Sequence, residues 1–167
     1  MQTKVPDYVE QIIIELCNKN IEAQKLGFGP FSAAICDGNG TIIAQNNNSV
    51  INDNCSICHA EINVIKQVQN KYQTYNLSSY NLSILITSEP CMMCLGAIMW
   101  SGIKNIYFGI SSKEVEKITG FDEGYKPNWI ENFEKKGIKA IGNIQPDLCK
   151  QVLLNYVNSG KIIYSPR

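Results

Sequence analysis

Two short stretches of the sequence carry residue types suited to metal-dependent chemistry. Cys91 and Cys94 stand three residues apart in the string PCMMC, so on a helix both thiols would face one side and could bind one ion. A third donor is His59, the only histidine of the chain, and Glu61 follows it two residues later. Two thiolates and one imidazole form a ligand set that favours zinc.

The spacing of His59 and Glu61 restricts where such a site can lie. Residues two apart in a helix point about 200° away from each other, so they cannot share a site on the side of that helix. We therefore expect the site beyond the helix N-terminus. If two helix N-termini meet there, their exposed N–H groups and dipoles would stabilise the thiolate forms of Cys91 and Cys94.

Three protein ligands leave the fourth tetrahedral position open for water, which is typical of a catalytic zinc. Zinc lowers the pKa of its bound water to about 7. A carboxylate beside the metal but not bound to it can carry protons between water and substrate, as a hydrolytic deamination requires. We therefore expect one Zn²⁺ per chain, held by His59, Cys91 and Cys94, with Glu61 as the proton carrier.

The rest of the chain alternates between helical and strand patterns, which predicts an α/β layered sheet. Between the first two strands, the glycines of the string DGNG allow the tight turn of a hairpin. Residues 45–54 read as a polar connection. The predicted strands are Phe31–Cys36, Thr41–Ala44, Leu82–Ile86, Ile106–Phe108 and Ile138–Ile141. The predicted helices are Tyr8–Leu26, Ala60–Tyr72, Cys91–Trp100 opened by Pro90, a short one after Gly109, one near Trp129, and Pro146–Val157.

Length and composition narrow the class of protein. A chain of 167 residues suits one domain spanning residues 1–167. The 15 basic and 15 acidic side chains give no net charge, which argues against nucleic acid as a partner. The apolar runs are far shorter than the roughly 20 residues that cross a bilayer, so we expect no membrane anchor. Seven cysteines and a charged start without a signal-peptide pattern indicate the cytoplasm.

Each motif alone has a simpler interpretation. A lone histidine is often structural, and a lone CxxC can be a redox pair or a closed zinc knot, so a thiol redox protein and a non-catalytic zinc module are rival classes. A second CxxC, Cys55 and Cys58, directly precedes His59. Binding of Cys58 to zinc would close the site, although His59 already occupies that approach. The remaining cysteines lie in apolar patterns and are most simply buried: Cys17, Cys36 and Cys149.

In combination, HxE followed by PCxxC resembles the signature of the cytidine deaminase superfamily. The strings HAEI from His59 and TSEPCMMCLGAI from Thr87 carry this resemblance. Two branches share the alanine between the histidine and the glutamate and an EPCxMC block: the tRNA adenosine deaminases and the bacterial-type guanine deaminases. The strings GPFSA, MW and GFDE resemble the guanine branch. The tRNA branch usually has a histidine where Trp100 stands and a basic surface, and this chain has neither.

The resemblance, which runs from about Gly27 to Tyr164, implies a three-layer α/β/α sandwich with a mixed five-stranded sheet. It implies hydrolysis of a free purine base, guanine to xanthine and ammonia, with tRNA adenosine deamination as the alternative. The preferred base among guanine, other aminopurines and amino-triazines stays open. The resemblance also implies a homodimer, since the family usually dimerises, often with its C-terminal segment exchanged between protomers.

Several residues that would contact the base are implied by the same resemblance. Asn48 would hydrogen-bond one edge of the purine, and the backbone of Ala60 would read the other edge. Phe31 and Trp100 would pack on or beside the ring. Without the resemblance, both aromatic residues would be taken as core.

The late loop and the C-terminus are implied to complete the pocket. Glu123 would relay a proton or hold the substrate amino group, with Asp122 beside it, and Tyr164 would close the pocket. The sequence departs from the family pattern at three points. Glu123 replaces the usual aspartate, Ser32 replaces a glycine, and three residues follow Tyr164.

Overall fold

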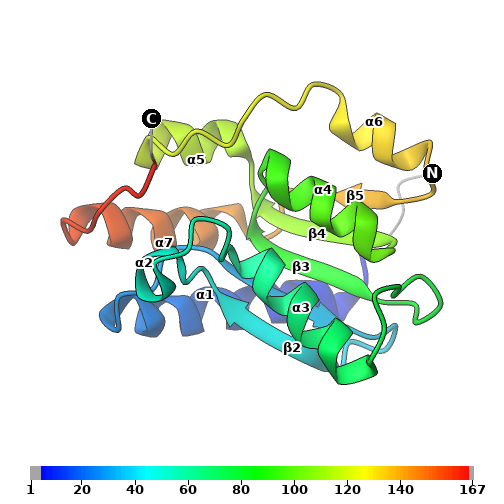
Figure 1. Ribbon diagram of the computed structural model, residues 1–167. Helices are drawn as coiled ribbons and strands as arrows, with labels where there is room; N and C mark the ends of the chain where they lie inside the picture. Colours follow the sequence, from blue (N-terminus) through cyan, green and yellow to red (C-terminus); the bar gives the residue numbers. More distant parts are fainter. Residues whose placement is uncertain (1–4, 166–167) are drawn as a thin grey trace.

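The computed structural model describes residues 5–165, which form a central sheet with helices on both faces (Figure 1). The strand order is β2-β1-β3-β4-β5. Strand β1 is antiparallel to β2 and β3, whereas β3, β4 and β5 run parallel, so the predicted mixed five-stranded sandwich is confirmed. The strands are β1 (Ser32–Cys36), β2 (Ile42–Asn47), β3 (Ser83–Ser88), β4 (Asn105–Ile110) and β5 (Lys139–Ile141).

The helices divide between the two faces of the sheet because side chains of each strand alternate in direction. Ile84 and Ile86 of β3 belong to the core under α3, α4 and α6, while Leu85 belongs to the core under α1, α5 and α7. All six residues of β3 are buried, as is typical of a strand covered on both faces. The helices are α1 (Asp7–Lys25), α2 (Val50–Asp53), α3 (Ala60–Tyr72), α4 (Met92–Ser101), α5 (Ser112–Thr119), α6 (Trp129–Glu134) and α7 (Pro146–Asn158).

Residues 45–54 differ from the predicted polar connection. Strand β2 continues to Asn47, and the four-residue helix α2 follows. The hydroxyl of Ser49 donates a 2.6 Å hydrogen bond to Asp53, and the helix ends at Asn54 in the left-handed conformation, with φ 48°. A helix this short has no apolar repeat to detect, so it is missed by periodicity.

The helices of residues 5–165 are each too short or too polar to span a lipid bilayer. The elements that matter for chemistry are the starts of α3 and α4. Both lie at the carboxyl-terminal end of β3, and the loop that joins α5 to α6 crosses above the start of α4 (Figure 1). This arrangement brings three distant chain segments to one edge of the sheet.

Candidate zinc site and adjoining pocket

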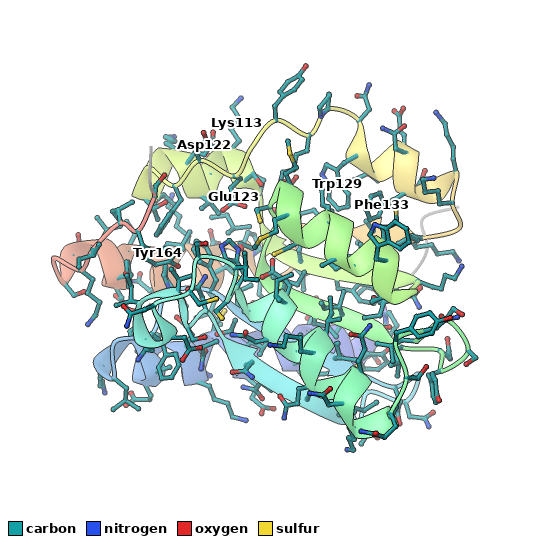
Figure 2. All side chains as sticks on the ribbon, viewed as in Figure 1. Lys113, Asp122, Glu123, Trp129, Phe133 and Tyr164 are labelled. Carbon is teal, nitrogen blue, oxygen red and sulfur yellow. The ribbon has the colours of Figure 1, made fainter. Side chains whose placement is uncertain are left out.

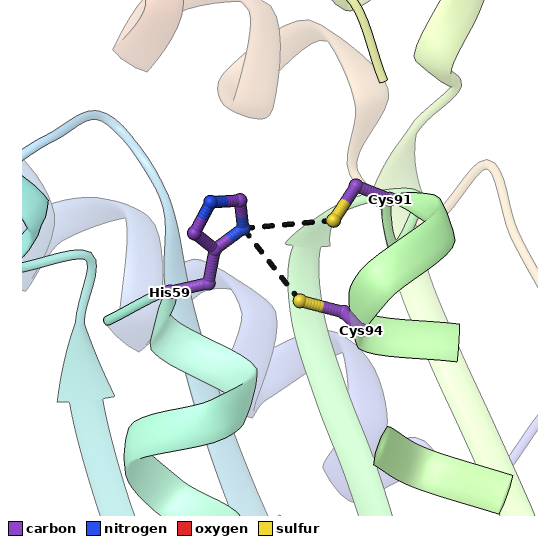
Figure 3. A group of neighbouring side chains, drawn as sticks. All are labelled: His59, Cys91 and Cys94. Atoms are coloured by element: carbon purple, nitrogen blue, oxygen red, sulfur yellow. Dashed lines mark hydrogen bonds between the residues drawn. The ribbon is translucent and has the colours of Figure 1, made fainter. Parts of the chain in front are cut away.

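The side chains of His59, Cys91 and Cys94 converge between the starts of α3 and α4 (Figure 3). Nδ1 of His59 lies 3.6 Å from Sγ of Cys91 and 3.6 Å from Sγ of Cys94. With zinc–nitrogen and zinc–sulfur bonds of about 2.0 and 2.3 Å, tetrahedral geometry separates such ligand atoms by about 3.5 Å. The donor set and its spacing therefore fit a zinc ion.

Two of the three ligands precede their helices instead of lying within them. His59 is the N-cap of α3 and Cys91 is the N-cap of α4, and both have extended backbone angles. Helix α4 therefore begins one residue later than predicted, and Pro90 stands before the cap. Because His59 lies outside the helix, the 200° rule does not apply to it, and it can share a site with Glu61 as expected.

The three donor groups compete for protons. A hydrogen bond with the Cys94 thiol and the nearby His59 ring lower the pKa of Cys91 to about 4. The Cys91 sulfur and burial raise the pKa of Cys94. Burial lowers the pKa of His59, but the hydrogen bond to Cys91 and the negative charges of Glu61, Cys91 and Glu123 together outweigh burial, so the pKa of His59 is raised. A divalent cation would displace these protons.

Glu61 lies in the first turn of α3 and is only 4% exposed. Burial raises the pKa of its carboxyl group, and the charge of Cys91 adds to this effect. A raised pKa favours the protonated form of the carboxyl group, and a general acid and base must both take and release a proton. Its position beside the ligands and its environment suit the role of a general acid and base.

A pocket of about 440 Å³ opens beside the ligands, a size common for small-molecule sites. His59 and Cys91 form part of its lining. Four of the substrate-contacting residues predicted from the sequence lie in the same lining: Phe31, Asp122, Glu123 and Tyr164. Figure 2 shows that Asp122 and Glu123 come from the loop above α4, and that Tyr164 comes from the C-terminal segment.

Asn48 and Ala60 are buried and do not line the pocket, although Ala60 directly follows His59, and Asn48 and the pocket residue Tyr164 both lie beside Gly29. Oδ1 of Asn48 accepts a 3.2 Å hydrogen bond from the Val50 amide, whereas Nδ2 has no hydrogen-bond partner within residues 5–165. Trp100 lies elsewhere. It is 82% exposed at the end of α4 and does not line the pocket, so a single chain does not bring it to the base as expected.

Phe121 is a pocket residue that sequence reasoning missed. Its ring contacts Phe31 with a centroid distance of 5.4 Å and Tyr164 with one of 4.6 Å, so it joins the two aromatic walls. The only signal in the sequence was an apolar residue inside the polar string GFDE. Met92 and Tyr125 also line the pocket.

The second CxxC is not part of the ligand cluster. The ligand atoms that gather within 4.8 Å of one another belong to His59, Cys91 and Cys94. The thiol of Cys58 instead forms a hydrogen bond with Cys55, which contributes to a raised pKa of Cys58. This arrangement favours an open three-ligand site over a closed four-ligand one.

Residues 7–110 match the sequence model of the cytidine and deoxycytidylate deaminase zinc-binding region. This range covers more than half of the chain and includes His59, Cys91 and Cys94. The chain belongs to this deaminase family. It is therefore a zinc-dependent hydrolytic enzyme, and the rival classes of redox protein and non-catalytic module fall away.

Solved structures similar to this deaminase include the guanine deaminase from Nitrosomonas europaea. The two share 34% identity with a TM-score of 0.81, over 92% of this chain and 85% of that one. Another similar structure, a variant enzyme in complex with 8-azaguanine, has 34% identity and a TM-score of 0.82. It matches over 90% of this deaminase and 83% of its own chain.

Curated relatives include members of both branches. The tRNA-specific adenosine deaminase of Buchnera aphidicola is 36% identical over 115 residues, 69% of this deaminase and 72% of that protein. The guanine deaminase of Bacillus subtilis is 37% identical over 98 residues, 58% of this deaminase and 60% of that protein. The second alignment thus spans less than two thirds of the relative, and sequence identity alone does not separate the branches.

Proposed function

We propose that this deaminase hydrolyses guanine to xanthine and ammonia. The observation that carries the proposal is the extent of its likeness to the guanine deaminase of Nitrosomonas europaea. That likeness covers 92% of the chain, so it must include most of the residues outside the family's common range of 7–110. Those residues include Asp122 and Glu123, which lie in the pocket lining and outside the shared zinc motifs.

In the proposed reaction, His59, Cys91 and Cys94 hold one zinc ion per chain. When bound, the metal supplies the acidity that activates a water molecule for attack on C2 of the base. Glu61 accepts one proton of that water and transfers it to N3. It then takes the proton of the new hydroxyl group on C2 and gives it to the amino group, which leaves as ammonia while the C2 carbonyl forms. Its burial, which raises the pKa of the carboxyl group, supports this cycle.

Asn48 forms hydrogen bonds with one edge of the base, and the backbone of Ala60 binds the other edge. Nδ2 of Asn48 is a buried donor without a partner within residues 5–165, and a buried unpaired amide is costly. A purine ring acceptor in the pocket would satisfy it. Phe31 would lie against the ring, and Tyr164 would cover it from the C-terminal segment.

Glu123 handles the exocyclic amino group, with Asp122 beside it. Burial raises the pKa of Glu123 to about 8, although the charge of Lys126 opposes this effect. A carboxyl group with that pKa is available in both protonation states near neutral pH, as a proton relay requires.

We also propose a homodimer formed through α4. Its exposed side carries Trp100, which is 82% exposed, and Met92, which is 53% exposed, while a Cβ on Gly96 would meet no atom within 4 Å. A second copy presents the same apolar surface, and a two-fold axis would pair them. Tyr164 already lines the pocket of its own chain, so this dimer needs no exchange of the C-terminal segment.

All seven cysteines are free, which supports the reducing cytoplasm as the location of the protein.

The tRNA alternative is supported by the 36% identity to the Buchnera aphidicola enzyme, but the chain has no net charge to attract RNA. Ammonia release should be measured with guanine, 2,6-diaminopurine, an amino-triazine, adenine, cytosine and guanosine as substrates. In a separate assay, the formation of inosine should be measured in a tRNA transcript. We expect guanine to be the fastest substrate. Inosine formation in the transcript with no ammonia from guanine would reverse the assignment.

A further inference from the structure

Glu89 is a carboxylate beside the ligands that the proposed chemistry does not use. It follows β3, stands two residues before Cys91, and its side chain is 14% exposed. Oε1 accepts a 2.7 Å hydrogen bond from Nε1 of Trp129, and Oε2 accepts a 2.9 Å hydrogen bond from the Ser112 amide. Because donors engage both oxygens and Glu89 does not line the pocket, it is suited to holding other groups instead of reacting.

Lys126 connects Glu89 to the loop of residues 120–127. Its Nζ lies 3.4 Å from Oε1 of Glu89, its side chain is only 9% exposed, and it also donates a hydrogen bond to the carbonyl oxygen of Pro90. The desolvation of a buried ion pair offsets much of its attraction, so such a pair contributes little net stability. What it does supply is a defined position for the loop.

The same loop is held at a second point close to the ligands. The amide of Met92 donates a 3.1 Å hydrogen bond to the carbonyl oxygen of Glu123. A Cβ on Gly124 would lie 3.2 Å from Cβ of Met92, so the loop passes tightly over the start of α4. Figure 2 shows Glu123 on this stretch of the loop, and Trp129 where the loop leads into α6. The backbone of Glu123 and the side chain of Lys126 are therefore the two ties on either side of Gly124 and Tyr125.

We propose that Lys126, held by Glu89 and the Pro90 carbonyl, is a positioning residue that fixes the Glu123 carboxyl group over the zinc ligands. Trp129 and the Ser112 amide keep Glu89 in place, so its carboxylate is a rigid anchor. The inference rests on the proposed function, since that function gives Glu123 its role at the substrate amino group.

The first experiment compares Lys126→Met with Lys126→Arg in the zinc-loaded enzyme. Misplacement of a reacting group by about 1 Å can cost about 100-fold, so we expect Lys126→Met to lower kcat by about 10- to 100-fold. KM should stay within about threefold and zinc content should not change, because Glu123 would act mainly in the transition state. Lys126→Arg keeps the ion pair and should restore kcat to within about threefold. The exposed Lys117 on α5 provides the control Lys117→Met, which removes the same charge.

A double variant separates positioning from general loss of structure. If Lys126 acts through Glu123, adding Lys126→Met to Glu123→Gln should lower kcat no further, because the positioned group is already missing. A further loss of about tenfold or more in the double variant would overturn the proposal. So would equal loss of kcat in Lys126→Met and in the control Lys117→Met.

Hydrogen exchange tests the tie without any substrate. In zinc-loaded Lys126→Met, the amide of Met92 should exchange faster than in the parent, because its acceptor lies on the released loop. Unchanged exchange at Met92 would refute the positioning role, whichever base the enzyme deaminates. Faster exchange in a protein whose parent releases no ammonia from guanine would support the tie and reject only the proposed function.

Discussion

A Cβ atom on Gly29 would lie 2.4 Å from the hydroxyl oxygen of Tyr164 and 2.9 Å from Oδ1 of Asn48. The C-terminal segment and the end of β2 therefore meet over a residue that has no side chain. Contacts below 3.0 Å force one partner to move, and both partners are proposed to enclose the base. The absence of a side chain at Gly29 thus lets Tyr164 and Asn48 approach each other at the pocket.

Gly29→Ala should raise KM for guanine by about tenfold or more with zinc content unchanged, since a displaced edge or cover loses base contacts worth about 1 to 3 kcal/mol. Steady-state kinetics would measure this. Adding Tyr164→Phe removes the closest colliding atom, a hydroxyl group without a partner within residues 5–165, and should recover part of the loss. A Gly29→Ala enzyme with parental KM would show that the contact does not shape the pocket.

The ligand set predicts the metal content. Purified protein should contain about one zinc per chain, and His59→Ala or Cys91→Ala should lose both zinc and activity because two protein ligands hold the ion poorly. Elemental analysis and ammonia release would be measured together. Cys55→Ala is the matched control, which should keep its zinc. Full occupancy in the His59 or Cys91 variant would disprove the ligand assignment.

Glu61→Gln keeps the shape of the side chain but cannot carry a proton. General acid–base groups contribute about 10²- to 10⁴-fold, and since Glu61 would serve several transfers, we expect a loss near 10⁴-fold in kcat. Zinc should remain bound, and affinity for a non-reactive purine should change little, because Asn48 and the Ala60 backbone would still hold the base. Activity within tenfold of the parent would exclude Glu61 as the proton carrier.

The hairpin turn should make stability depend on pH through Asp37. Its side chain accepts 2.9 Å hydrogen bonds from the amides of Asn39 and Thr41, and these bonds lower the pKa of the carboxyl group. A pKa that is lower in the folded state gives stability above the unfolded value of about 3.9, and this stability is lost as pH falls through the folded value. The Tm difference between the parent and Asp37→Asn should therefore shrink from pH 7 to pH 2.5. A difference that stays constant would contradict this role.

Association through α4 can be tested at Trp100. Trp100→Glu places a charge in the proposed interface and should convert the dimer to a monomer in sedimentation experiments. Tyr75 is equally exposed, at 83% against 82% for Trp100, and lies outside α4. Tyr75→Glu is therefore the matched control and should leave the mass unchanged. A monomeric parent, or a dimeric Trp100→Glu protein, would reject this interface.

Much of the fold was predictable because its elements repeat apolar residues with a clear period. Helix α3 has the predicted bounds, Ala60–Tyr72, and β3 extends the predicted buried run by two residues at its end. Helix α2 was missed because it is held by the contact between Ser49 and Asp53 and not by a repeat. The ligand cluster was predictable since CxxC spacing and a single histidine leave few combinations.

Contacts between distant loops could not be predicted from the sequence. Glu89 and Trp129 are 40 residues apart, and no local pattern marks them as partners. The exposure of Trp100 was unpredictable for a related reason. Helix α4 is apolar nearly all round, so its sequence does not tell which side faces the sheet.

The backbone positions of His59 and Cys91 also bear on how far this enzyme can be stabilised. A helix N-cap is normally serine, threonine, aspartate or asparagine, and loss of such a cap costs about 1 kcal/mol. Neither α3 nor α4 has a side-chain cap hydrogen bond, and the cap residue of each is a proposed zinc ligand. Substitution of His59 or Cys91 by a capping residue would stabilise the helix but remove a donor from the proposed zinc site. Improvements in thermal stability must therefore come from other parts of the chain.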